Sequence, residues 1–331
     1  MTPQPPPMKR NSAGGQRRVG VEIEFAGLPP RATAELVEAL YGGRLEVASA
    51  HRQWVRGTRW GDFRIELDTQ YAHPDERLMH PAVASDGEWE RMRQDLHART
   101  RELIGDVATG LVPTEIVCPP VPWDELEALD RLFDALREHG AKGTGDSLLY
   151  GFGLHLNPEL PSLEAGNILA YLKAYILQAS WLREQIQVDI TREILPYANP
   201  FPRDYALLIL AADYTPDLAA LIDDYLEYNP TRNRELDMLP LFAYLAPEHP
   251  HPLLHGPLIK PRPTFHYRLP NAQLSEPGWG ATTEWNRWLE VERLAATPGT
   301  LARRSAEYLA RHRPSRLVRW FQSLRRRVLG S

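Results

Sequence analysis

The stretch that most constrains the fold is an alternating segment near the start of the chain, residues 18–25. Apolar residues occupy every second position, and Glu22 and Glu24 lie between them. A period of two is typical of a β-strand with one face on a core and one polar face. The two carboxylates can be a solvated face, or they can face a cleft and bind Mg²⁺ or Mn²⁺. The alternation predicts a strand and leaves both roles of the glutamates open.

Four later segments alternate in the same way and each carries side chains that bind metals or phosphates. Because residues two apart in a strand share a face, each segment presents these side chains together. They are residues 60–69 with Glu66 and Asp68, 113–120 with Glu115, 151–158 with His155 and Asn157, and 264–270 with His266 and Arg268.

The order of these motifs resembles a known family. The chain reads Arg-x-Gly-x-Glu-x-Glu-Phe, then an acid-rich strand, Glu-Ile-Val-x-Pro-Pro, Gly-Leu-His-x-Asn and Tyr-Arg-Leu-Pro. This series, from about residue 17 to residue 275, is similar to the amidoligase family. That family belongs to the carboxylate-amine ligase superfamily, with glutamine synthetase and glutamate-cysteine ligase.

The resemblance implies a fold and a reaction. The expected fold is α+β, a glutamine synthetase-like curved antiparallel sheet that forms a half-barrel backed by helices. The expected reaction is ATP-dependent amide formation through an acyl phosphate, with small-molecule or peptide carboxylates and amines as substrates. Two alternatives stay open: a binding or scaffold protein that has lost the chemistry, and a metal-dependent hydrolase that uses the same acids.

The resemblance also implies roles for individual residues. ATP and Mg²⁺ or Mn²⁺ are the expected cofactors, and Arg268 is expected to stabilise the transferring phosphoryl group. Glu66 is a weaker candidate metal ligand, and Arg18 is a candidate for a cofactor contact or for a pair with an acid of the same cluster. From the sequence itself, Lys260 and Arg262 precede the arginine strand and can add positive charge to a phosphate pocket, with ordinary surface charge as an equal alternative. The expected metal ligands are Glu22, Glu24, Asp68, Glu115 and His155, of which His155 is also a candidate catalytic residue.

Two positions depart from the family pattern. Asn157 stands where the family has a second histidine, and His266 stands where a glutamate usually precedes the arginine. Each side chain can still bind a metal, but a nitrogen donor at residue 266 would soften one site. These departures leave the number and identity of the metals open.

Composition and turn signals predict the organisation of the chain. Residues 1–15 are rich in Pro, Gly and Ser and are expected to be a disordered leader without a signal peptide. Residues 16–300 form the expected catalytic domain, with a helical insert at about 162–240. Helices are expected over 34–40, capped by Thr33, and from residue 123 to a stop at Gly140, with another over 91–103. The segment 232–240, which includes Asp237, can carry a substrate or nucleotide contact, but a solvated helix start is expected.

Residues 301–331 differ from the rest of the chain. Nine arginines face a single acid, Glu307, and apolar residues from 317 to 328 form a stripe at helical spacing. This is the pattern of a basic amphipathic helix, which can bind a protein partner or an acidic membrane surface. Packing on the body of the same chain is an equal alternative.

Several further features favour ordinary structural roles. A net charge of −5 argues against a general nucleic-acid binder, and a single cysteine, Cys118, fits a cytoplasmic protein. Cys118 is expected to be buried. The histidines at 249, 251 and 255 alternate with prolines, which favours a loop over a zinc site. Residues 143–147 are expected to form a turn.

Overall fold

A computed structural model describes residues 1–67, 112–144, 152–186 and 198–312. The expected helix over 91–103 and the candidate ligand Asp68 lie outside these ranges. None of the helices in the described ranges combines the length and apolar character needed to cross a membrane.

The described strands form one open antiparallel sheet. Its order is β2-β3-β4-β5-β1-β7-β9-β8, with β6 paired to the start of β1. The strands are β1 (Arg18–Phe25), β2 (Arg44–Ser49), β3 (Arg52–Thr58), β4 (Gly61–Leu67), β5 (Thr114–Val117), β6 (Val121–Pro122), β7 (Leu154–Pro158), β8 (Leu236–Asp237) and β9 (His266–Tyr267). All five predicted strand segments therefore contain a strand, and β1 lies near the middle.

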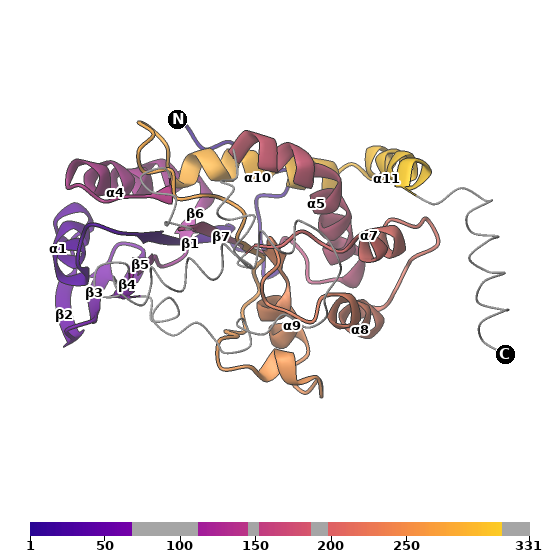
Figure 1. Ribbon diagram of the computed structural model, residues 1–331, viewed down its shortest axis with the longest axis horizontal. Helices are drawn as coiled ribbons and strands as arrows, with labels where there is room; N and C mark the ends of the chain where they lie inside the picture. Colours follow the sequence, from indigo (N-terminus) through magenta and orange to yellow (C-terminus); the bar gives the residue numbers. More distant parts are fainter. Residues whose placement is uncertain (68–111, 145–151, 187–197, 313–331) are drawn as a thin grey trace, which may run out of the picture.

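Helices cover one face of this sheet and leave the other open (Figure 1). The apolar side chains of β1, such as Val21 and Ile23, are fully buried on the covered face, while Glu22 points to the open one. The helices are α1 (Pro30–Tyr41), α4 (Leu126–Glu138), α5 (Ala165–Ile186), α7 (Arg203–Ile209), α8 (Leu218–Tyr228), α9 (Leu239–Leu245), α10 (Ala281–Ala295) and α11 (Pro298–His312), with short 3₁₀ turns η2 (Trp123–Glu125) and η4 (Pro252–His255). The result is a mixed α+β fold, as predicted.

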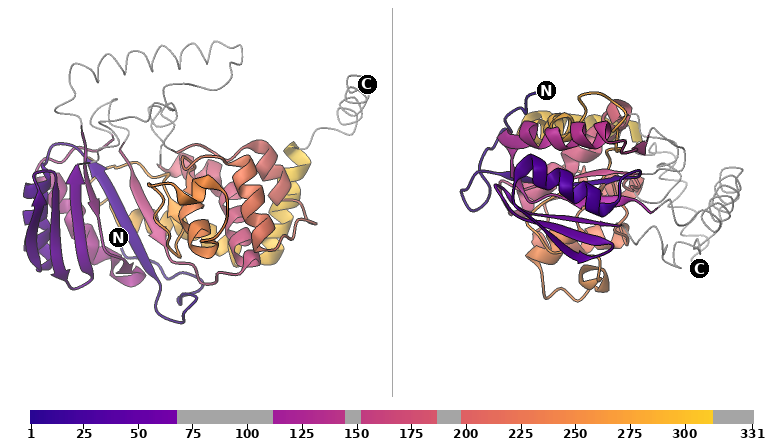
Figure 2. Two further views of the ribbon diagram at one scale, coloured as in Figure 1. Left: turned by 90° about the horizontal axis from the view of Figure 1, so that it is seen from below. Right: turned by 90° about the vertical axis from the view of Figure 1, so that its left-hand side faces the viewer.

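The helices between β7 and β9 build a second half of the molecule beside the strands (Figure 2). Helix α5 runs from Ala165 to Ile186, within the helical insert expected at about 162–240. The stretch 187–197 lies outside the described ranges. This arrangement brings α9 and the loop after it beside the open face of the sheet.

One local prediction was wrong. Thr33 does not cap α1: the helix begins at Pro30, and Thr33 is buried inside it with its hydroxyl bonded to the Pro29 carbonyl. The proline fixes φ and pre-organises an earlier first turn. After α1 the chain forms the hairpin of β2 and β3, which turns after Ser49.

The N-terminal segment lies on α10. Composition favoured disorder for residues 1–15, whereas in the structure Gln4 bonds to Trp285 and Asn286, and Pro3 and Pro6 are buried. Proline-rich chain loses little entropy on ordering, which offsets the small area that it buries. This segment leads directly into β1.

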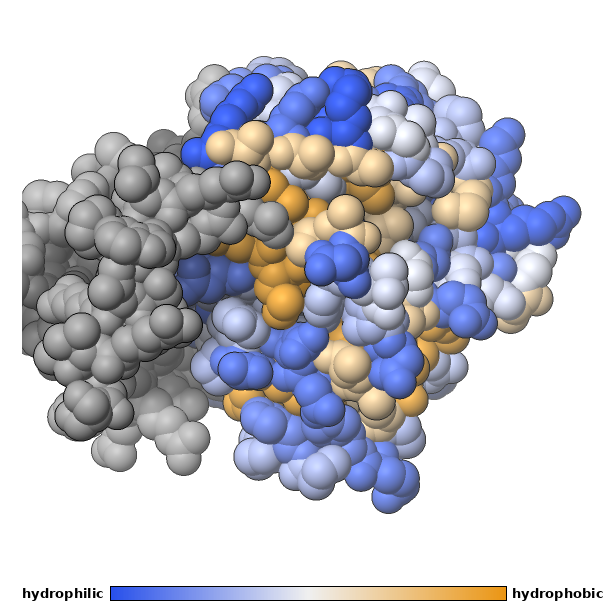
Figure 3. Space-filling view, turned by 90° about the vertical axis from the view of Figure 1, so that its right-hand side faces the viewer, coloured by the Kyte–Doolittle hydropathy of each residue, from blue (hydrophilic) through white to orange (hydrophobic). Residues whose placement is uncertain are grey.

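Helix α11 packs against α5. Arg304 donates hydrogen bonds to Gln178 and to the Leu177 carbonyl, and Leu301 and Leu309 are buried. The first part of the expected basic tail therefore lies on the body of the protein. The end of the molecule that carries α7, α8 and α11 shows an apolar band between polar margins (Figure 3).

Candidate functional site

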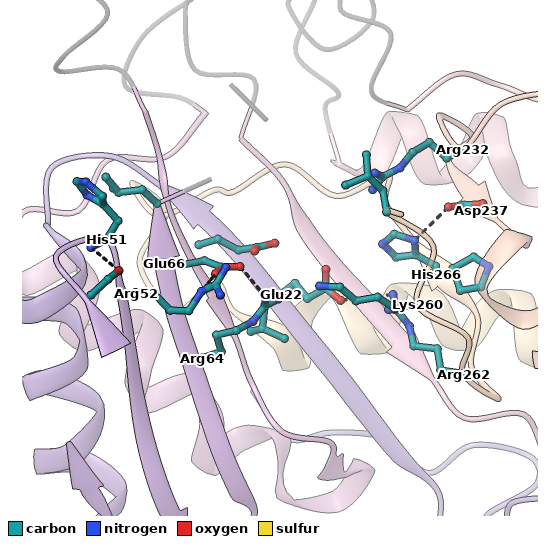
Figure 4. A pocket seen from close by; sticks show the side chains of 16 residues that line it. Glu22, His51, Arg52, Arg64, Glu66, Arg232, Asp237, Lys260, Arg262 and His266 are labelled. Carbon is teal, nitrogen blue, oxygen red and sulfur yellow. Dashed lines mark hydrogen bonds and ion pairs between the residues drawn. The ribbon is translucent and has the colours of Figure 1, made fainter. Parts of the chain in front are cut away.

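A cavity of about 540 Å³ opens on the uncovered face of the sheet (Figure 4). The strands provide one side, with Glu22 near the centre, and the loop after α9 provides the other. The lining residues are Glu22, Ser49, His51, Arg52, Arg64, Glu66, Leu67, Glu115, Val117, Arg232, Asp237, Pro240, Leu258, Lys260, Arg262 and His266.

Glu22, His155 and His266 meet at this face. Glu22 on β1 is directly opposite His155 on β7, and β9 brings His266 alongside. The His155 Nδ1 lies 3.4 Å from Glu22 Oε2, and the two imidazole rings are 5.2 Å apart in an edge-to-face arrangement. One potential ligand atom from each of the three residues falls within 4.8 Å of the others. Together they could hold one metal ion.

His266 is fixed from behind by Asp237. Its Nδ1 lies 3.3 Å from Asp237 Oδ2, and the other carboxylate oxygen accepts the Leu239 amide. Burial lowers the pKa of His266 to about 3, although Asp237 opposes this effect, so the ring is neutral at physiological pH. Because Asp237 accepts from Nδ1, the lone pair of the neutral ring is on Nε2.

Glu22 is held by two neighbours on its other side. Asn157 Nδ2 donates to Glu22 Oε1 at 2.9 Å, and the Arg262 guanidinium lies 3.4 Å from the same oxygen. Burial alone would raise the pKa of Glu22, but the hydrogen bond to His155 and the charge of Arg262 hold it well below its usual range. Glu22 is therefore a carboxylate.

Gly20 makes room for Asn157. The two residues are directly opposite in the β1–β7 pair, and a Cβ on Gly20 would lie 3.2 Å from the Asn157 Cβ. Most real Cβ atoms avoid such a contact, so glycine allows the amide to lie over β1 and reach Glu22. Asn157 in turn accepts a hydrogen bond from Arg262 at 2.8 Å. Here Asn157 positions Glu22.

A row of three acids crosses the sheet beside this trio. Glu66, Glu115 and Glu24 are directly opposite one another on β4, β5 and β1. Like charges in such positions have Cβ atoms about 5 Å apart and repel unless cations offset them. Arg52 and Arg64 pair with Glu66, at 2.5 and 2.6 Å. The Gly153 amide donates to Glu24 Oε2 at 3.0 Å.

The structure places the other predicted site residues as follows. Lys260 lines the cavity and is exposed. Arg268 is buried, bonds through its guanidinium to the Arg232 carbonyl at 2.7 Å, and does not line the cavity. Arg18 is exposed at the start of β1, away from the lining residues. Of the predicted site residues, Glu22, Glu115 and Lys260 line the cavity. His155 contacts Glu22, whereas Arg18 and Arg268 do not line the cavity.

Asp237 is the main site residue that sequence reasoning placed wrongly. It is 1% exposed in the two-residue strand β8, whereas a solvated helix start was expected. The signal was weak, because two residues are too few to show alternation. Arg232, which lies a few residues before Asp237, also lines the cavity.

The cysteine and the loop histidines, which were expected to have structural roles, are buried or have local partners. Cys118 is 5% exposed, and burial raises its pKa. His249 pairs with Asp223 at 3.0 Å and His255 bonds to a backbone carbonyl, so each ring has a local role in the loop. Gly143 packs so tightly that a Cβ there would lie 1.9 Å from the Ala272 carbonyl oxygen. Residues 145–147 of the expected turn lie outside the described ranges.

Comparison with known families agrees with the order of these motifs. A family model described as "Putative amidoligase enzyme" matches residues 15–290, which include the whole described sheet. The chain belongs to this amidoligase family. No curated protein and no solved structure matches it significantly.

Proposed function

We propose that this protein is an ATP-dependent carboxylate-amine ligase. The observation that carries the proposal is the arrangement of charge in the cavity of an amidoligase-family chain. Carboxylates from β1 and β5 face cationic side chains of the opposite wall: Arg232, Lys260 and Arg262. A nucleotide triphosphate with divalent cations needs both kinds of group, acids for the cations and cations for the phosphates.

The residues of the acidic row fit Mg²⁺ or Mn²⁺. Glu24 and Glu115 are neighbours on the sheet with oxygen donors, which are the ligands that these ions prefer. Glu22 lies next to them on the same face of β1. When bound, such ions would offset the negative charge of the phosphates and of the carboxylate substrate.

The protein side chains then have separable tasks. Lys260 and Arg262 would bind the phosphates and hold the γ-phosphoryl group against the substrate carboxylate. The carboxylate oxygen takes the phosphoryl group from ATP and ADP leaves, giving an acyl phosphate. The amine nitrogen then attacks the carbonyl carbon, loses a proton and expels phosphate, which leaves the amide. Arg268, which is buried, would hold the Arg232 segment in place through its bond to the Arg232 carbonyl.

Titration with a non-hydrolysable ATP analogue tests the nucleotide site. We expect binding that requires Mg²⁺ or Mn²⁺, that is lost in Glu115→Gln, and that persists in Glu46→Gln, an exposed glutamate on β2 outside the cavity. Phosphate release that depends on both a carboxylate and an amine would then identify the reaction. Absence of nucleotide binding under every condition would favour the scaffold alternative, and turnover without ATP would favour a hydrolase.

A further inference from the structure

The Glu22, His155 and His266 trio has a different donor set from the acidic row beside it. Two imidazoles and one carboxylate converge from β1, β7 and β9, with ligand atoms within 4.8 Å. Mg²⁺ prefers an all-oxygen shell, whereas imidazole nitrogen favours Zn²⁺, Co²⁺ and related first-row ions. The trio therefore fits Mg²⁺ poorly.

The environment of His266 supports the same conclusion. Its ring is 5% exposed, and its Nε2 has no hydrogen-bond partner among the described residues. A buried polar atom without a partner is unfavourable for the folded state and calls for an explanation. Asp237 holds Nδ1, which leaves Nε2 available for a bond to a metal. A carboxylate behind a histidine in this way is the usual support of a metal-binding imidazole.

Glu22 is also prepared for a single additional bond. Asn157 and Arg262 both contact Oε1, whereas Oε2 contacts His155 Nδ1 at 3.4 Å, a bond that an ion between the two residues would replace. Tetrahedral Zn²⁺ with bonds of about 2.0–2.2 Å separates its ligand atoms by about 3.4 Å. The ligand atoms of the trio lie within 4.8 Å of one another, so side-chain rotation would have to bring them closer together to reach that spacing.

We infer that Glu22, His155 and His266 bind one nitrogen-preferring divalent ion, of the Zn²⁺ or Co²⁺ class, and discriminate against Mg²⁺. Asp237 is a positioning residue that orients the His266 ring. A water or a substrate oxygen would complete the coordination from the cavity. The inference stands whether or not the protein is a ligase, since it concerns these donors alone.

Titration of metal-free full-length protein with Co²⁺, without nucleotide, tests this inference. The visible absorption of bound Co²⁺ reports nitrogen and oxygen coordination directly, and displacement by Zn²⁺ or Mg²⁺ reports selectivity. We expect one Co²⁺ per chain, displaced by stoichiometric Zn²⁺ and retained in a large excess of Mg²⁺. Asp237→Asn should weaken Co²⁺ binding about 10- to 100-fold.

Three histidine variants complete the test. His266→Ala should abolish the Co²⁺ spectrum, and His266→Glu should remove the preference over Mg²⁺ by restoring an oxygen donor. His51→Ala is the matched control, because His51 lines the same cavity outside the trio. Unchanged Co²⁺ binding in folded His266→Ala would overturn the inference, as would equal displacement by Mg²⁺ and Zn²⁺.

If His266→Ala does not fold, the His266→Glu and Asp237→Asn titrations decide in the same way. Wild-type protein that binds Co²⁺ but does not bind the ATP analogue would count against the ligase proposal alone.

Discussion

The side-chain amide of Asn157 joins Glu22 to Arg262: it donates to Glu22 Oε1 at 2.9 Å and accepts from the Arg262 guanidinium at 2.8 Å. An amide can do both at once, whereas a neutral histidine can do so only through two nitrogens on opposite sides of its ring. At this position the amide therefore fixes the orientation of a carboxylate.

The first prediction concerns this contact. Asn157→Ala should weaken Co²⁺ binding about 10- to 100-fold, because Glu22 loses the donor that orients it. The measurement is the same Co²⁺ titration, with circular dichroism as the check of folding. Asn286→Ala is the control, because Asn286 lies on α10 and donates to the Thr2 carbonyl, outside the trio. Equal affinity in wild type and folded Asn157→Ala would rule out a positioning role.

The second prediction concerns a buried ion pair between the start of β1 and α10. Arg17 and Glu292 are 1% and 0% exposed and form two hydrogen bonds, at 2.6 and 2.7 Å. Arg17→Met leaves Glu292 charged and unpaired, so it should lower the free energy of unfolding by about 3–5 kcal/mol. Urea denaturation measures this loss.

A double-mutant cycle separates the pair from its surroundings. Arg17→Met with Glu292→Gln should recover part of the loss, because the neutral amide can still accept from Trp288 Nε1. Arg31→Met is the control: its pair with Glu35 is exposed and should contribute about 0–1 kcal/mol. Additive losses in the double mutant would show that the two buried charges do not interact.

The third prediction compares two glycines. A Cβ on Gly143 would lie 1.9 Å from the Ala272 carbonyl oxygen, and that backbone follows β9 and cannot rotate away. Gly143→Ala should therefore destabilise the fold by about 1–3 kcal/mol or more. At Gly166 in α5 nothing lies within 4 Å, so Gly166→Ala should be neutral or stabilise by up to about 1 kcal/mol. Thermal denaturation of both variants checks the contrast, which would fail if their midpoints moved together.

Local alternation was enough to predict the strands and the shared face of their polar residues. The apolar positions of β1 are buried as a period of two requires, and Glu22 lies on the opposite face. That His266 would soften a metal site stays a prediction, which rests on the donor type of the residue rather than on the alternation.

Pairing across the sheet could not be predicted in this way. Register places His155 opposite Glu22, and Asp237 reaches His266 only through the pairing of β8 with β9, two strands of two residues each. Strands this short leave no periodic signal, and their position follows from the packing of α9 and the helices before it. Arg268 shows the converse: it was predicted to lie in a strand, but β9 ends at Tyr267, and the burial of Arg268 goes with its bond to the distant Arg232 carbonyl.

The last prediction uses the pKa of a buried acid in α10. Glu284 is fully buried, with Oε1 bonded to Trp279 and Arg287, and burial raises its pKa above the ordinary 4.5 despite these partners. Above pH 4.5 the folded protein therefore holds this proton more tightly than the unfolded chain. Its contribution to stability should decline as the pH rises from 4.5 through the folded pKa. Glu284→Gln removes the titration, so the unfolding free energy of the variant minus that of wild type should increase over this window.

Asp62 provides a control of opposite sign. The Gly57 amide and Arg56 hold the pKa of this exposed carboxylate below its ordinary 3.8. Its contribution is present above pH 3.8 and is lost as the pH falls through the folded pKa, so Asp62→Asn should differ least from wild type in acid. Urea midpoints of wild type and both variants across the pH range measure the two slopes. A flat difference for Glu284→Gln would mean that Arg287 and Trp279 fully offset the cost of burying the charge.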